Sequence, residues 1–249
     1  MILSSREAFY INGFAECEIV NKYSSDKIIK IAEEIVNNNI KENYFLEEKY
    51  KGTRDLRPYV YNYDKCFFSF LKENKIVEKI KKLTGSLYLP YHLQLRYTTC
   101  NSRVGKNSYM DWHRDAYMMN GKILGRLPPP IKLIFYPALN DKEINKARLK
   151  IVPNSHTIQM HSDQLYTSRF GAPINNLDSQ LISGLEHKEI KTSNDSYTLF
   201  NTAMLHGAIH TDDYAPRVIY TFILEDQFND NCDDHHKETK RYYQNLQDS

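Results

Sequence analysis

The segment Tyr109-Met110-Asp111-Trp112-His113-Arg114-Asp115-Ala116 contains the pattern His113-x-Asp115. Residues two apart on an extended strand point to the same face of the strand. An imidazole and a carboxylate at this spacing can therefore reach one metal ion together. Two side chains leave a metal site incomplete, so a further ligand must come from elsewhere in the chain.

The best candidate for that ligand is His206, which ends the apolar run Ala203-Met204-Leu205. Two histidines and one carboxylate on one face of an ion form the facial triad of non-haem Fe(II) oxygenases. Eleven positions after His206 comes Arg217, whose guanidinium can hold a carboxylate through two parallel hydrogen bonds. His210 is a rival, because on a strand it would share the face of His206. The run Thr211-Asp212-Asp213 is typical of a turn, which favours His206.

Four pieces of sequence follow one another along the chain. They are His113-x-Asp115, the segment Leu149-Lys150-Ile151-Val152-Pro153-Asn154-Ser155-His156, His206 and Arg217. In this order they resemble the phytanoyl-CoA dioxygenase-like group of 2-oxoglutarate-dependent oxygenases, over roughly residues 90–225. The eleven-residue spacing from His206 to Arg217 is the family's. The segment ending at His156 is similar to the family's Pro-Gly-Ser-His turn, and Asn154, in place of glycine, also tolerates left-handed backbone angles.

The resemblance implies a metal, a cosubstrate and a reaction. His113, Asp115 and His206 would bind Fe(II), which leaves open positions for 2-oxoglutarate and O2. Halogenating relatives have a small residue in place of the carboxylate ligand. The presence of Asp115 therefore predicts hydroxylation.

The resemblance also implies contacts to the cosubstrate. Arg217 would pair with the distal carboxylate of 2-oxoglutarate, an orienting role that a lysine could not fully reproduce. By analogy with the family's fold, Gln94 and Thr221 would add hydrogen bonds. These residues would position the cosubstrate, while the iron would supply the difficult chemistry.

Composition limits the compartment and the partners. The chain has 249 residues, of which 41% are hydrophobic, enough for one buried core. Its net charge is +2 and it has no basic run, which argues against nucleic acid as a partner. The cysteines, Cys17, Cys66, Cys100 and Cys232, form no Cys-x-x-Cys pair, as in a reduced cytosolic protein. No signal peptide or membrane-spanning run is evident, so a soluble, cytoplasmic protein that does not bind membranes is expected.

Helical patterns precede strand patterns along the chain. A short strand is expected at residues 8–14, and a helix capped by Ser24 or Ser25 is expected to run to about residue 37. A second helical zone covers residues 65–83, with Gly85 as its stop signal. Strand patterns follow at about residues 87–97, 131–138, 148–153, 187–191, 196–206 and 217–225.

This order predicts a mainly β fold with helices, a double-stranded β-helix (jelly roll, cupin-like) with the N-terminal helices packed outside. We expect a single domain over residues 1–249. It would comprise a helical part (1–86), the jelly-roll core (87–225) and a polar tail (226–249) that forms a short helix or frays.

Other residues with chemical potential have simpler interpretations. His156 is expected to hold its turn through hydrogen bonds, and His92 to be a satisfied core histidine. Arg114 should face away from the two ligands beside it and form a structural ion pair. The cluster Cys232-Asp233-Asp234-His235-His236 lies in the polar tail and is expected to be solvated. His210 is expected near the mouth of the site.

The substrate is expected to be a small molecule. Residues 160–190 would form a mobile cover over the metal pocket, with Arg169, Lys188 and Lys191 as anion contacts. These favour a polar, anionic substrate over a long acyl-CoA.

Two other functions compete with this interpretation. Nucleic-acid-demethylating oxygenases of the AlkB kind carry a second arginine six positions after the first, where this chain has Ile223. A non-catalytic jelly-roll binding protein would have no need to keep the complete triad.

Overall fold

The computed structural model describes residues 4–36, 53–56, 60, 64–98, 112–115, 117–119, 122–124, 128–157, 166–167, 173–174, 185–209, 215–227 and 234–247. Its α-helices are α1 (Ser5–Asn12), α2 (Tyr23–Val36), α4 (Cys66–Glu73), α5 (Ile76–Thr84) and α7 (Asp234–Gln247). Its longer strands are β1 (Phe14–Glu18), β2 (Thr53–Leu56), β3 (Tyr88–Thr98), β6 (Ile131–Phe135), β7 (Ala147–Ile151), β10 (Lys188–Lys191), β11 (Ser196–Asn201), β12 (His206–Ala208) and β13 (Ala215–Leu224). Two short pairs complete the strands: β4 (Tyr117–Met119) with β5 (Lys122–Leu124), and β8 (Tyr166–Thr167) with β9 (Pro173–Ile174).

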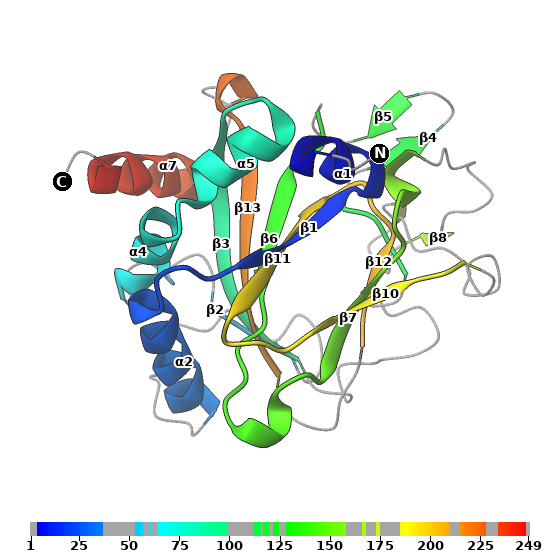
Figure 1. Ribbon diagram of the computed structural model, residues 1–249. Helices are drawn as coiled ribbons and strands as arrows, with labels where there is room; N and C mark the ends of the chain where they lie inside the picture. Colours follow the sequence, from blue (N-terminus) through cyan, green and yellow to red (C-terminus); the bar gives the residue numbers. More distant parts are fainter. Residues whose placement is uncertain are drawn as a thin grey trace.

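Two antiparallel sheets form the body of the fold. The larger has the order β1-β11-β6-β13-β3-β2 and the smaller β10-β7-β12. Helices α2, α4, α5 and α7 lie on the side of the larger sheet that faces away from the smaller one (Figure 1). The predicted β-rich jelly roll with helices packed outside is confirmed.

Each face of the larger sheet contributes to a different hydrophobic cluster. Because side chains alternate along a strand, Val218, Tyr220 and Phe222 of β13 join the cluster beneath the helices. Ile219, on the opposite face, joins the cluster between the two sheets. Phe70 of α4 stacks on Tyr220 at a centroid distance of 6.1 Å, which fixes the helical layer on the sheet. The side chains on the inner face of β13 therefore lie between the two sheets, where they can line a site.

The strand predicted at residues 8–14 is wrong, because this region forms α1 and then β1. The Ser4 side chain accepts a hydrogen bond from the Glu7 backbone N–H, and Glu7 accepts one from the Ser4 backbone N–H. This capping box begins the helix. Gly13, at φ 82°, ends it in a left-handed conformation. A Cβ there would lie 2.5 Å from His156 Nδ1, so the close contact with the turn also requires glycine.

Other predicted boundaries are corrected by side-chain contacts. Helix α2 begins at Tyr23, whose N–H donates to the Asn21 side chain, whereas the hydroxyl of Ser24 donates to Glu73 and that of Ser25 to the Lys22 carbonyl. The predicted serine cap is therefore wrong. The zone at 65–83 is two helices, because Lys75 interrupts it at φ 50°. The predicted stop at Gly85 is confirmed.

Two further elements bear on the predictions. The strand pattern at 196–206 divides into β11 and β12, and the polar tail contains the helix α7.

Among the helices of the described part of the chain, none is long and apolar enough to cross a membrane. The described cysteines, Cys17 and Cys66, are buried free thiols.

Candidate active site

Backbone pairing brings the two predicted histidine ligands together. The His113 N–H donates to the His206 carbonyl at 2.8 Å, and the His206 N–H donates to the His113 carbonyl at 2.9 Å. Their ring centroids lie 4.2 Å apart. The Asp115 N–H donates to the Thr202 carbonyl at 3.0 Å, which turns its side chain toward the same place. The ligand atoms of His113, Asp115 and His206 all lie within 4.8 Å of one another, so the three could hold a metal ion.

Local contacts prepare His206 for metal binding. Its Nδ1 lies 2.9 Å from the Met204 carbonyl oxygen, which can only accept, so Nδ1 carries the proton and the lone pair of Nε2 is available. Burial, together with the positive charges of His113 and Lys132, lowers the pKa of His206 to about 3. The ring is therefore neutral at pH 7, as a metal ligand must be.

Asp115 is held in its charged form. Burial opposes ionisation of the carboxyl, but the charge of Lys132, its hydrogen bond and the two histidines when they are protonated outweigh burial and lower the pKa of Asp115. His206 Nε2 lies 3.5 Å from Asp115 Oδ2, and His113 Nε2 lies 3.8 Å from Oδ1. Two imidazole nitrogens and a charged carboxylate thus converge, a donor set that suits a divalent transition metal.

The Pro-x-Ser-His turn connects both parts of this group. The Ser155 hydroxyl accepts from the Leu205 N–H at 2.8 Å, next to His206, and donates to the Val152 carbonyl at 2.6 Å. The Ser155 carbonyl accepts from the Arg114 guanidinium at 2.8 Å, between the other two ligands. Ser155 and Arg114 are 0% and 3% exposed, so these bonds are protected from water. The turn therefore ties the strand of His206 to the segment of His113 and Asp115.

Three sequence predictions about this turn can be compared with the structure. Asn154 has φ 62°, so its expected left-handed backbone is confirmed. His156 Nε2 donates to the Tyr10 carbonyl at 3.0 Å, which agrees with a role in holding the turn. Arg114 is buried, and the ion pair predicted for it stays a prediction. Its contact with Ser155 is a hydrogen bond to a backbone carbonyl.

Ser155→Ala is expected to lower the free energy of unfolding by about 1–3 kcal/mol, because the buried Leu205 N–H would lose its acceptor. Chemical denaturation of the metal-free protein measures this loss. Thr157→Ala is the control, because the exposed Thr157 hydroxyl, which donates to the Asn154 carbonyl, can exchange that bond for water. Equal stability of Ser155→Ala and the wild type would contradict the role assigned to this hydroxyl.

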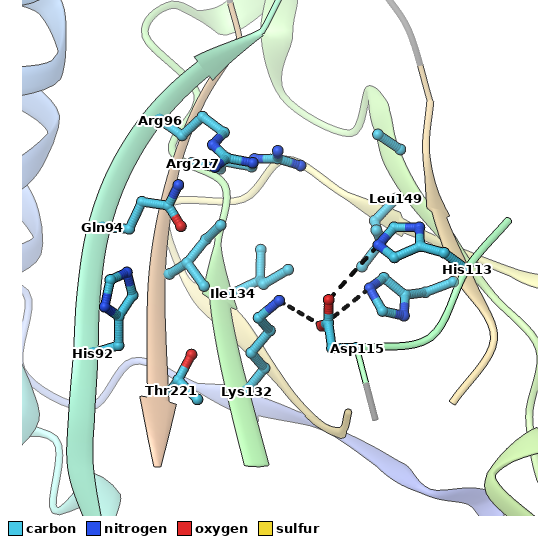
Figure 2. Close-up of a pocket in the computed structure, with 13 residues that line it drawn as sticks. His92, Gln94, Arg96, His113, Asp115, Lys132, Ile134, Leu149, Arg217 and Thr221 are labelled. Atoms are coloured by element: carbon cyan, nitrogen blue, oxygen red, sulfur yellow. Dashed lines mark hydrogen bonds and ion pairs between the residues drawn. The ribbon is translucent and has the colours of Figure 1, made fainter. Parts of the chain in front are cut away.

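A cavity of about 250 Å³ lies beside the three ligands, and the larger sheet forms its floor. Strand register arranges that floor in cross-strand rows (Figure 2). The first row is His92, Thr221 and Lys132; the second is Gln94, Ile219 and Ile134; the third contains Arg96 and Arg217. Lys132 contacts Asp115, so the first row lies beside the ligands and the arginines lie two rows deeper.

The predicted cosubstrate residues all reach this cavity. Gln94, Arg217 and Thr221 line it, and Gln94 and Arg217 are 5% and 7% exposed. His92 also lines it, and is partly rather than fully buried. Sequence reasoning missed Arg96, which shares the inward face of β3 with Gln94 at a spacing of two residues.

Lys132 is the other lining residue that the sequence analysis missed. It interrupts the apolar strand Ile131-Lys132-Leu133-Ile134-Phe135, and a lone charge in such a strand was the available signal. Its ammonium donates to Asp115 Oδ2 at 2.5 Å. Asp115 is the one acidic side chain among the described residues that line the cavity.

Several predicted features fall elsewhere. Lys188 pairs with Glu16 at 3.0 Å and, like Lys191, is not among the described residues that line this cavity. His210, Arg169, Cys100 and Cys232 lie outside the described residues. Most of the predicted cover at 160–190 also lies outside them, as do the side chains of His235 and His236.

No protein-family model matches the sequence, and no curated protein matches it significantly. Solved structures do match. The non-heme alpha-ketoglutarate-dependent epimerase SnoN from nogalamycin biosynthesis is 12% identical with a TM-score of 0.57, covering 87% of this chain and 78% of SnoN. HygX from Streptomyces hygroscopicus, solved with nickel and 2-oxoglutarate bound, is 12% identical with a TM-score of 0.55, covering 87% of this chain and 85% of HygX.

The fold is that of non-haem 2-oxoglutarate-dependent enzymes. The carbocyclase SnoK, also from nogalamycin biosynthesis, shares it at 12% identity and a TM-score of 0.58, covering 88% of this chain and 84% of SnoK. An epimerase and a carbocyclase thus have the same architecture. The fold alone therefore does not determine the activity of this chain, which depends on its own site residues.

Proposed function

We propose that this protein is an Fe(II)- and 2-oxoglutarate-dependent dioxygenase that hydroxylates a small polar molecule. The observation that carries the proposal is the convergence of His113, Asp115 and His206 beside a cavity whose far end holds Arg217. The order of the four sequence motifs, which resembles that of the phytanoyl-CoA dioxygenase-like group, supports the proposal.

The triad would hold the iron and leave one side of it open. His206 would bind through Nε2, since its Nδ1 donates to a carbonyl, and His113 would bind through the Nε2 that faces Asp115. Asp115 would add the charge that makes the site prefer a divalent cation. Bound iron would supply O2 activation coupled to oxidative decarboxylation of 2-oxoglutarate, which yields succinate and CO2.

The floor of the cavity would orient the cosubstrate. The guanidinium of Arg217 would hold the distal carboxylate of 2-oxoglutarate by two hydrogen bonds. Gln94 and Thr221, in the rows nearer the triad, would hydrogen-bond the rest of the molecule. Ile134 and Ile219 would exclude water from the path between these groups.

The size and polarity of the cavity support a small polar substrate. HygX has been solved with hygromycin B bound and SnoN with nogalamycin RO bound, so proteins of similar fold bind small molecules. The presence of Asp115 supports hydroxylation, because the carboxylate ligand leaves no position for a halide.

Succinate release from 2-oxoglutarate tests this function. The wild-type protein with Fe(II) and O2 is expected to release succinate slowly alone and faster with its substrate, found by a screen of polar metabolites. His206→Ala, with equal iron added, is the control that should release none. Folded wild-type protein that consumes no 2-oxoglutarate at any iron concentration would refute the proposal.

A further inference from the structure

Lys132 places a positive charge directly against the acidic ligand. Its side chain enters the cavity from β6 and is 20% exposed. The ammonium donates to Oδ2 of Asp115 at 2.5 Å. A charged lysine in an otherwise apolar strand costs desolvation energy, so a specific partner is needed to retain it there.

The two carboxylate oxygens of Asp115 have different surroundings. Oδ2 receives the hydrogen bond from Lys132, whereas Oδ1 is the oxygen nearest His113, at 3.8 Å. Figure 2 shows the carboxylate of Asp115 between Lys132 and His113. Oδ2 also lies 3.5 Å from Nε2 of His206, so Lys132 binds the oxygen on the side of His206, and Oδ1, on the side of His113, does not receive this hydrogen bond.

We propose that Lys132 is a positioning residue that holds one oxygen of Asp115, so that the metal is bound through the other oxygen alone. The inference rests on the proposed function. A carboxylate can bind a metal through one oxygen or two, and the second oxygen would occupy a further position. Restricting Asp115 to one oxygen keeps three positions open for a chelating cosubstrate and O2.

The charge of Lys132 adds a second, opposite effect. Its ammonium repels a divalent cation and competes with that cation for Asp115, so it weakens metal binding. The same charge attracts 2-oxoglutarate, which is a dianion. Lys132 thus weakens the binding of the metal and strengthens the binding of the cosubstrate.

Replacing Lys132 with methionine separates this role from a merely structural one. Lys132→Met has a side chain of similar length without charge. Calorimetry with Mn(II), then with 2-oxoglutarate added to the Mn(II)-loaded protein, gives both affinities without turnover. We expect Mn(II) affinity to rise by about tenfold and 2-oxoglutarate affinity to fall by about tenfold. Each change is what the loss of one modest electrostatic interaction would produce. Solvent proton relaxation should report fewer waters on Mn(II), because Asp115 can then bind through both oxygens.

Two control variants and one substitute for the test variant accompany this measurement. Lys132→Arg keeps the charge and the donor, and should restore the wild-type ratio of the two affinities. Lys188→Met removes a lysine whose partner, Glu16, lies outside the cavity, and should change neither affinity. Lys132→Gln provides the same test if the methionine variant does not fold, with both affinities shifting in the same directions.

The possible outcomes distinguish this inference from the proposed function. If both affinities fall together, or neither changes, Lys132 only supports the structure and the inference is wrong. If the wild-type protein itself binds neither Mn(II) nor 2-oxoglutarate, the proposed function fails first.

Discussion

His206→Ala is expected to lower Fe(II) affinity on the order of a hundredfold or more. Loss of one of three ligands should weaken metal binding more than loss of a residue that only hydrogen-bonds a ligand. His206 is 4% exposed, and its backbone N–H, its carbonyl and its Nδ1 all form hydrogen bonds, so no other side chain can readily take its place. His113→Ala and Asp115→Ala should have comparable effects. Anaerobic metal titration of each variant measures the loss.

A nearby histidine provides the matched control for this prediction. His210→Ala should keep the metal affinity of the wild type. It should also keep the slow turnover of 2-oxoglutarate that the wild type shows without substrate, because the eleven-residue spacing to Arg217 belongs to His206. Reversed results for His206→Ala and His210→Ala would reassign the ligand and remove the spacing argument. Wild-type affinity in any triad variant would exclude that residue from the site.

Arg217→Ala is expected to retain the metal and lose most of its affinity for 2-oxoglutarate. Removing the partner of a buried carboxylate costs about 2–5 kcal/mol, roughly a 30- to 4000-fold weaker binding. Arg217 is 7% exposed, so water can only partly replace it. Calorimetric titration of 2-oxoglutarate into Mn(II)-loaded protein gives the dissociation constant.

Two comparisons make this result specific to Arg217. Arg217→Lys keeps the charge but loses the fork of parallel donors, so an intermediate loss is expected. Arg96→Ala tests the neighbouring guanidinium, which lies directly opposite on β3. An unchanged dissociation constant in Arg217→Ala would show that the cosubstrate carboxylate binds elsewhere.

Local patterns in the sequence predicted most of the strands, and the family resemblance added a ligand set whose members the structure brings together. Alternating apolar residues give the inward and outward faces of β3 and β13, and these faces place Gln94, Arg217 and Thr221 along the cavity. The helix stop at Gly85 follows from the backbone freedom of glycine.

Other features depend on contacts that sequence alone does not specify. The meeting of Lys132 with Asp115 requires the register of β6 against β13 and the path of the chain between them. Helix α1 could have been recognised from the capping box of Ser4 and Glu7, but its run Ala8-Phe9-Tyr10-Ile11, rich in aromatic residues, resembled a strand. At the start of helix α2, the Asn21 side chain accepts from the Tyr23 N–H, while the Ser24 hydroxyl donates to Glu73, a contact across 49 positions that the local sequence does not reveal.

The origin of the oxygen in succinate tests the central claim most directly. Atom balance requires that oxidative decarboxylation of 2-oxoglutarate by O2 place one oxygen atom of O2 in the new carboxylate of succinate. The wild-type protein with Fe(II), 2-oxoglutarate and ¹⁸O₂ is therefore expected to give singly labelled succinate, and His206→Ala none. Succinate formed by the wild-type protein without the label, or no succinate from iron-loaded protein, would contradict the account.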